Sequence, residues 1–226
     1  MHLLQVAPTL ALGSMSNDHT VVLLPGLDDS IAQTTAQQTA LQEVGPVLTP
    51  DIGVSGTGPV ILEDPALKVR AAISAAKTDH VVLVGHGWGG MVALHIAATY
   101  GERVAALMLS TNARLQTIMV RSIFYGVLSL LPATVVQQLG GKPADVAALF
   151  DQVRPVDFKP LAERVHAPAH VVVGERDVAN RGPSAALAKS LPLGNMRVVP
   201  GAGPGWRAQR PELIAQLLVE LLSSWR

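Results

Sequence analysis

The stretch Val81–Gly90, with the sequence VVLVGHGWGG, is the most informative part of this chain. Its four unbroken apolar residues are typical of a strand that helices cover on both faces. A glycine-rich turn and a helical pattern follow at once, which is the frame of a nucleophile elbow, Gly-x-Ser-x-Gly. The central position of such an elbow sits at a strained positive φ. Here it is Gly87, which tolerates that backbone but carries no nucleophile.

Short apolar runs alternate with helical patterns on both sides of this stretch. The expected strands are Thr20–Leu24, Gly45–Leu48, Val81–Val84, Val104–Leu109, Ala169–Val173 and Met196–Val199. The expected helices are Ile31–Glu43, Asp64–Lys77, Trp88–Tyr100, Ser184–Ser190 and Pro211–Trp225. This alternation predicts an α/β fold with a mostly parallel, doubly wound sheet. Residues 114–163 break the rhythm, so we expect a core of residues 1–113 and 164–226 with a small helical cap at 114–163.

Composition excludes several classes of protein. The 226 residues carry 17 Lys and Arg against 17 Asp and Glu, and the formal net charge of zero argues against a nucleic-acid partner. The absence of cysteine excludes a disulfide scaffold and a cysteine nucleophile. At 49% hydrophobic and 15% charged residues the chain is too apolar to be disordered. These numbers predict a neutral globule whose low charge is compatible with a homodimer.

A membrane span is not expected. The apolar start, MHLLQVAPTLAL, lacks the basic residues that open a secretory signal. The long uncharged run Ser122–Gly141 is interrupted by Pro132 and two glutamines, which favours a lid or core helix over a spanning one. We therefore expect a cytoplasmic protein.

Four further motifs, with the elbow, resemble the α/β-hydrolase superfamily of esterases, haloperoxidase-like proteins and epoxide hydrolases. PGLDDS at Pro25–Ser30 looks like the family's oxyanion loop, and GERD at Gly174–Asp177 looks like its acid motif. PGAGPGW at Pro200–Trp206 is similar to the loop that carries the triad histidine, and the 114–163 insertion matches the family's cap in place and composition. The resemblance implies the α/β-hydrolase fold over nearly the whole chain.

The same resemblance implies that two of three catalytic positions are replaced. It puts the triad acid at Asp177, the nucleophile at Gly87 and the histidine at Pro204. Without nucleophile and base, the Ser-His-Asp mechanism is expected to be absent. Asp177 then has two alternatives, a general base with a raised pKa or a structural carboxylate paired with a nearby arginine. The candidate arginines are Arg176, Arg181 and Arg207.

Backbone amides can keep an oxyanion hole without the triad, and Leu27 and Trp88 are its candidates. The residues expected to bind a substrate are Leu27, Asp28, His86, Trp88, Asn112, Phe124, Tyr125 and Trp206. For several of them a packing role is the alternative. His86 adjoins Gly87 and should point away from it, and the two tryptophans can instead cap the core. His95 is expected to be a buried, hydrogen-bonded histidine.

No pair of histidines has metal-ligand spacing with a carboxylate, so neither a metal nor a cofactor is expected. Three functions remain open. The first is a degenerate α/β-hydrolase that binds an apolar, carbonyl-bearing small molecule, with lyase, isomerase or cyclase chemistry if it is an enzyme. The second is an inactivated variant of a serine esterase or epoxide-hydrolase-like enzyme. The third is a non-catalytic scaffold or interaction protein.

Overall fold

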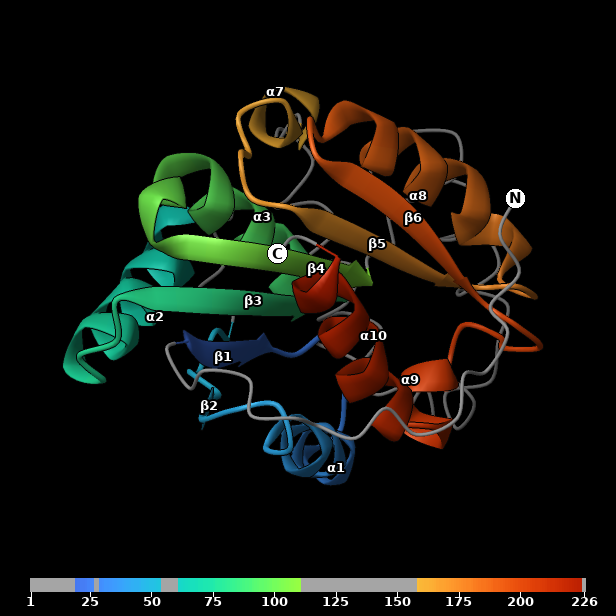
Figure 1. Ribbon diagram of the computed structural model, residues 1–226, viewed down its shortest axis with the longest axis horizontal. Helices are drawn as coiled ribbons and strands as arrows, with labels where there is room; N and C mark the ends of the chain where they lie inside the picture. The colour runs from blue at the N-terminus through green and yellow to red at the C-terminus, as the bar shows by residue number, and fades with distance from the viewer. Residues whose placement is uncertain (1–18, 27–28, 54–60, 111–157, 225–226) are drawn as a thin grey trace.

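A six-stranded parallel sheet runs through the centre of the protein (Figure 1). The structure, a computed structural model, describes residues 19–26, 29–53, 61–110 and 158–224. The strands are β1 His19–Leu24, β2 Val47–Leu48, β3 His80–His86, β4 Val104–Ser110, β5 Ala169–Gly174 and β6 Gly194–Val199. Their order is β2-β1-β3-β4-β5-β6, and every neighbouring pair is parallel. All carboxyl ends therefore meet at one edge of the sheet.

Helices cover both faces of this sheet. They are α1 Ile31–Leu41, α2 Glu63–Ala75, α3 Gly87–Thr99, α7 Phe158–Ala162, α8 Val178–Ser190, α9 Trp206–Gln209 and α10 Glu212–Ser223, with a 3₁₀ turn at Gly101–Arg103. α1, α9 and α10 pack on one face, and α2, α3, α7 and α8 pack on the other. The doubly wound α/β fold expected from the sequence is confirmed.

Two hydrophobic cores result, one on each face. Along β3, Val81 and Leu83 belong to the core under α3, while Val82 and Val84 belong to the core under α10. All four side chains are fully buried, because successive residues of a strand point to opposite faces and both faces are covered. This is why the strands read as unbroken apolar runs in the sequence.

The helix α8 begins earlier than expected. The pattern placed its start at Ser184, after Pro183, but the helix begins at Val178 and contains Pro183. Asp177 precedes the first turn and accepts a hydrogen bond from the Asn180 amide at 3.3 Å, which caps the helix well before the proline. The expected start at Ser184 is therefore wrong.

The expected cap lies mostly outside the described residues, which include only 158–163 of it. These residues contain α7, whose Phe158 and Ala162 are buried in the core beneath α3. The boundary of the cap at residue 163 stays a prediction. The run Ser122–Gly141 also lies outside the described residues.

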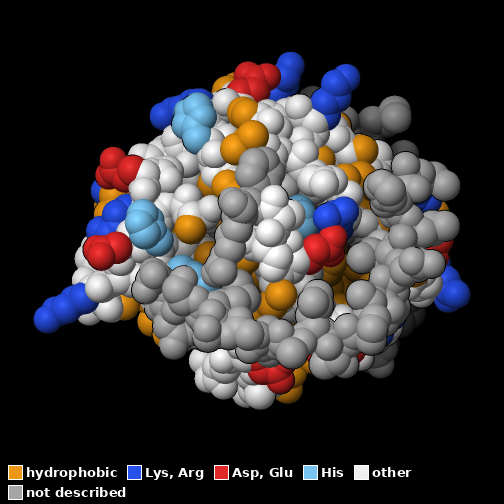
Figure 2. Space-filling view, in the orientation of Figure 1, with side chains coloured by type: hydrophobic (Ala, Val, Ile, Leu, Met, Phe, Trp, Pro, Cys, Tyr) orange, Lys and Arg blue, Asp and Glu red, His pale blue; other side chains and the backbone are white. Residues whose placement is uncertain are grey.

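The described helices and the face drawn in Figure 2 bear on membrane and nucleic-acid binding. No helix there is long and apolar enough to cross a membrane. On the face drawn in Figure 2, coloured Lys and Arg side chains lie scattered or beside Asp and Glu and do not form a continuous positive area. Strong electrostatic binding of nucleic acid has no support on this face.

Candidate functional site

The turn between β3 and α3 has the backbone of a nucleophile elbow. Gly87, the first residue of α3, has φ of 49°. A Cβ on Gly85 would lie 2.7 Å from the Gly89 carbonyl oxygen, and a Cβ on Gly89 would overlap the Leu24 carbonyl oxygen at the end of β1. Only glycine lets the strand, the helix and the end of β1 approach this closely.

Trp88 follows directly in α3 and is buried in the core under that helix. Its indole Nε1 donates a 2.8 Å hydrogen bond to the Ile52 carbonyl in the loop after β2. Trp206, the first residue of α9, is buried in the core on the opposite face. Both tryptophans therefore have the packing role that the sequence left as an alternative, and contact with a ligand stays a prediction.

Asp177, the expected triad acid, lies at the carboxyl edge and is buried. Both of its carboxylate oxygens accept from the Asn180 side-chain nitrogen, at 3.0 and 2.8 Å. Among the described ion pairs none joins Asp177 to an arginine. The Asp177 carboxylate is thus bonded to Asn180, and the pairing with Arg176, Arg181 or Arg207 that was one alternative is not found among the described ion pairs. A general-base role for Asp177 stays a prediction.

The acid loop is held against the loop that carries Pro204. The Arg176 amide donates to the Ala202 carbonyl at 2.8 Å, and Glu175 accepts from the Gly201 amide at 2.7 Å. Gly174 permits this contact, since a Cβ there would lie 2.5 Å from the Ala202 oxygen. Pro204 itself is exposed. The positions assigned to the acid and the histidine therefore belong to two loops with direct backbone contacts.

The start of the expected oxyanion loop carries a second carboxylate. Asp29 Oδ2 accepts from the Gly26 amide at 2.8 Å and so closes the turn after β1. Its other oxygen, Oδ1, lies 3.4 Å from Arg207 Nη2 in α9. Arg207 therefore pairs with Asp29 and links the oxyanion loop to the loop region of Pro204.

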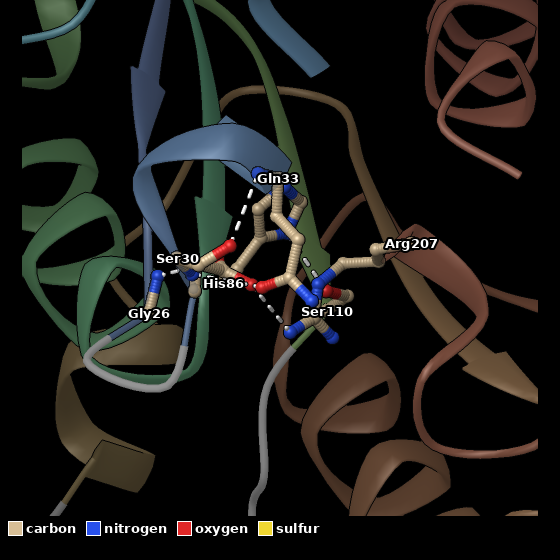
Figure 3. Close-up of polar contacts among 7 residues, drawn as sticks. Gly26, Ser30, Gln33, His86, Ser110 and Arg207 are labelled. Atoms are coloured by element: carbon tan, nitrogen blue, oxygen red, sulfur yellow. Dashed lines mark hydrogen bonds and ion pairs between the residues drawn. The ribbon is translucent and has the colours of Figure 1, made fainter. Parts of the chain in front are cut away.

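A histidine–serine pair lies beside this ion pair. His86 Nδ1 and Ser110 Oγ are 2.8 Å apart, and both side chains are buried. Figure 3 shows Arg207 reaching toward this pair from α9, with Ser30 and Gln33 of the α1 amino-terminus nearby. Burial and, to a smaller degree, the charge of Arg207 hold the pKa of His86 well below its usual range. His86 is therefore neutral at pH 7.

The two ring nitrogens of His86 have different surroundings. Nδ1 is bonded to Ser110, whereas Nε2 is buried and has no hydrogen-bond partner among the described residues. The side chain faces the α1 and α10 layer, because it follows Val82 and Val84 at alternate positions of β3. His86 is therefore buried against this layer, and contact with a ligand stays a prediction.

Other expected site residues lie outside the described part. They are Leu27, Asp28, Asn112, Phe124 and Tyr125. The expectation that His95 is buried is wrong, since its ring is partly exposed and lies 3.0 Å from Glu63 of α2. Sequence reasoning missed Ser110 as the partner of His86. A signal was available, because both residues end neighbouring strands.

Metal coordination finds no support among the described side chains. Within residues 19–26, 29–53, 61–110 and 158–224, no three His, Asp or Glu residues cluster closely enough to hold an ion. The carboxylates of Asp29, Glu175 and Asp177 at the carboxyl edge are instead engaged in hydrogen bonds and one ion pair.

Comparison with protein families agrees with this geometry. The sequence profile described as "Alpha/beta hydrolase family" matches residues 21–217, which is most of the chain. The chain belongs to the α/β hydrolase family. The match covers the elbow, the acid loop and the loop of Pro204 in one continuous span. A comparison with curated proteins yields no match.

Solved structures show the same fold in this α/β hydrolase. An esterase from Thermogutta terrifontis is 23% identical with a TM-score of 0.70, covering 91% of this chain and 89% of that one. The enol-lactonase from Burkholderia xenovorans is 18% identical with a TM-score of 0.67 and 92% coverage of both chains. MGS-MChE2, an α/β hydrolase from a lagoon sediment metagenome, is 18% identical with a TM-score of 0.70, covering 91% of each chain. At these identities the likeness concerns the fold alone.

Proposed function

We propose that this α/β hydrolase binds an apolar, carbonyl-bearing small molecule at the carboxyl edge of its sheet and has lost Ser-His-Asp hydrolysis. The observation that carries the proposal is Gly87 at φ of 49°. The elbow backbone is kept, but the position that would present the attacking oxygen has no side chain. Pro204 stands where the resemblance puts the base, so covalent hydrolysis at the elbow lacks both reacting groups.

The backbone at this edge still offers hydrogen-bond donors. α3 begins at Gly87 directly after a strand, so its first amides are not used within the helix. Amides at a helix amino-terminus favour an acceptor oxygen such as a carbonyl or carboxylate. The buried Trp88 and the apolar end of β1 surround them with low-polarity material. This combination supports an apolar ligand with one oxygen acceptor.

The state of Asp177 supports the same conclusion. In a working triad the carboxylate orients and stabilises the histidine. Here both oxygens are engaged by Asn180, and the carboxylate also caps α8. A chain with this arrangement can still act on a ligand by holding it in a reactive conformation. A lyase, isomerase or cyclase reaction is the chemistry that fits such a site.

Two measurements on the purified protein test this function. The first is thermal unfolding with a panel of esters, lactones and cyclic ketones of increasing apolar size. A ligand that binds the folded state at a hundred times its Kd stabilises the protein by about 2.7 kcal/mol, which raises Tm measurably. The second is hydrolysis of the same esters. The proposal expects binding without Ser-His-Asp turnover, and it fails if no member of the panel raises Tm.

Restoring the triad separates the proposal from its alternatives. The variant Gly87→Ser/Pro204→His reinstates nucleophile and base, and Asn180→Ala added to it releases Asp177. Strong esterase activity in either variant would identify an inactivated hydrolase. Gly87→Ser with Pro204→Ala is the matched control, because it contains the nucleophile without the base. Absence of ligand binding together with a stable dimer would favour the third alternative, a non-catalytic scaffold or interaction protein.

A further inference from the structure

β3 and β4 end side by side at the carboxyl edge of the sheet. His86 and Ser110 are their last residues and face each other in register. Both side chains point to the α1 and α10 side, since Val84 and Met108, two positions earlier, pack in that core. In open α/β sheets, ligands bind outside the carboxyl ends of the strands. The pair therefore lies in the region of the sheet where chemistry is expected, next to an elbow that lacks its nucleophile.

The geometry of the pair meets the requirement for an activated hydroxyl. His86 Nδ1 and Ser110 Oγ are 2.8 Å apart, within the range of about 2.6–3.2 Å that separates nucleophile and base in covalent catalysis. The contact joins two neighbouring strands and does not close a turn.

From this contact we infer that Ser110 and His86 form a relocated serine–histidine dyad, with Ser110 as nucleophile toward small acyl or phosphoryl donors and His86 as its base. This reactivity goes beyond ligand binding at the elbow and does not depend on it. The donors are defined by chemistry, namely an electrophilic carbonyl carbon or phosphorus with a good leaving group.

The neighbouring charges suit this role. A base must be unprotonated to accept the serine proton, and His86 is neutral at pH 7 because burial and Arg207 depress its pKa. The same two factors disfavour the imidazolium that forms, which slows the proton transfer. Arg207 also places a positive charge near the hydroxyl that becomes an anion in the transition state (Figure 3). Asp29 holds the guanidinium in place through the 3.4 Å ion pair.

In the covalent step with diisopropyl fluorophosphate, Ser110 Oγ forms a bond to phosphorus, the phosphorus–fluorine bond breaks, and fluoride leaves. The hydroxyl proton moves to His86 Nδ1. With an ester, Oγ bonds to the carbonyl carbon, and the leaving alkoxide takes the same proton from His86. Water then hydrolyses the acyl-enzyme and regenerates the hydroxyl.

The reaction is expected to be slow, for two further reasons in the structure. His86 Nε2 has no carboxylate partner among the described residues, so nothing there stabilises the imidazolium as a triad acid does. Ser110 is only 6% exposed, which limits access to small reagents. Labelling over hours by a small probe is therefore a better readout than turnover.

The experiment is incubation of the full chain with diisopropyl fluorophosphate, followed by intact mass and peptide mapping. We expect one adduct per chain, located on Ser110. His86→Asn should slow labelling by about a hundredfold, the usual loss when a general base is removed. Ser184→Ala is the matched control, since Ser184 is a fully buried serine on α8, and it should label like the wild type.

Several outcomes would overturn the inference. The first is that the wild-type chain forms no adduct while a serine esterase is labelled in the same solution. The second is an adduct on a residue other than Ser110. The third is a labelling rate in His86→Asn equal to that of the wild type. Because the peptide map of the wild-type chain locates the adduct, the result does not depend on whether Ser110→Ala folds. Ligand-induced changes in Tm play no part in this readout, so failure of the dyad and failure of the proposed ligand binding are distinguishable.

Discussion

Arg207 Nη2 lies 3.4 Å from Asp29 Oδ1, although 178 positions separate the two residues in the chain. Their side chains are only 12% and 6% exposed, so this ion pair is shielded from solvent. Asp29 also closes the turn after β1 through the Gly26 amide. The pair therefore fixes the loop after β1 against α9, across the carboxyl edge of the sheet.

Replacing both members of this pair should cost less stability than the sum of the two single replacements. Arg207→Met leaves a buried carboxylate without its counter-ion, and we expect a loss of about 3 kcal/mol in the free energy of unfolding. Arg207→Met/Asp29→Asn should lose less than the sum of the single variants, because no unpaired charge remains. Urea unfolding of the three variants measures the coupling.

An exposed ion pair is the control for this comparison of single and double variants. Glu163 lies 3.8 Å from Lys159 on the surface, and Glu163→Gln should change the free energy of unfolding by less than about 1 kcal/mol. Additive losses at Asp29 and Arg207 would show that the two side chains do not interact in solution.

His170 should make the protein less stable in weak acid. It is buried in β5, and burial, followed by the charge of Arg197, lowers its pKa to about 4, with a hydrogen bond to the Leu217 backbone opposing the shift. In the unfolded chain the pKa is about 6.5. Between these values the unfolded state binds the proton and the folded state does not, so stability falls as pH falls from about 6.5 toward 4.

Between pH 7.5 and pH 5, protonation of His170 in the unfolded state should lower the free energy of unfolding by about 2 kcal/mol. Urea unfolding at both pH values measures it. His170→Gln keeps a polar side chain but does not titrate. The decrease in its free energy of unfolding between pH 7.5 and pH 5 should therefore be about 2 kcal/mol smaller than that of the wild type. His86, whose pKa is also lowered, contributes in the same direction and remains in both proteins. Equal losses in the two proteins would contradict the assignment.

Two glycines with open space around them should respond to alanine in opposite directions. Gly201 has φ of 65°, and nothing lies where its Cβ would be, so Gly201→Ala should cost about 1 kcal/mol through backbone strain alone. Gly182 lies in α8 directly before Pro183, whose ring crowds a Cβ on the preceding helical residue, so Gly182→Ala should stabilise the protein by less than about 0.5 kcal/mol. The change in Tm on thermal unfolding gives the direction of each effect. A higher Tm for Gly201→Ala would contradict the left-handed backbone at that position.

Gly89→Ala should be the most damaging of these glycine replacements. Its Cβ would overlap the Leu24 carbonyl, which is rigid backbone at the end of β1. To relieve this overlap, α3 must move away from the sheet. We expect the free energy of unfolding to fall by more than about 3 kcal/mol, or the variant not to fold. Recovery of soluble Gly89→Ala protein with wild-type Tm would show that the elbow is looser than the structure indicates.

Most of the fold could be predicted from sequence, because two covered faces turn each strand into an unbroken apolar run. Val81–Val84 shows this directly, and the glycines around Gly87 indicate the turn. The start of α8 could not be predicted in the same way. Pro183 suggested a boundary, but the cap formed by Asp177 and Asn180 sets the first turn and tolerates the proline inside the helix.

The polar site was only partly predictable. Asp177 and Gly87 were found because they belong to local motifs. The partners of Asp29 and His86 come from distant segments, and a single sequence does not encode which arginine or serine will reach them. Arg207 was expected near Asp177 and instead meets Asp29, since Asn180 already occupies the Asp177 carboxylate.

The long separation between Asp29 and Arg207 has a consequence for biosynthesis. Synthesis proceeds from the amino-terminal side, and β1, β3 and β4, which are neighbours in the sheet, are made before α9. The histidine–serine contact can thus form from the first half of the chain. The Asp29–Arg207 ion pair beside it needs α9, which follows all six strands in the sequence. A nascent chain can therefore contain the histidine–serine pair before the ion pair beside it has formed.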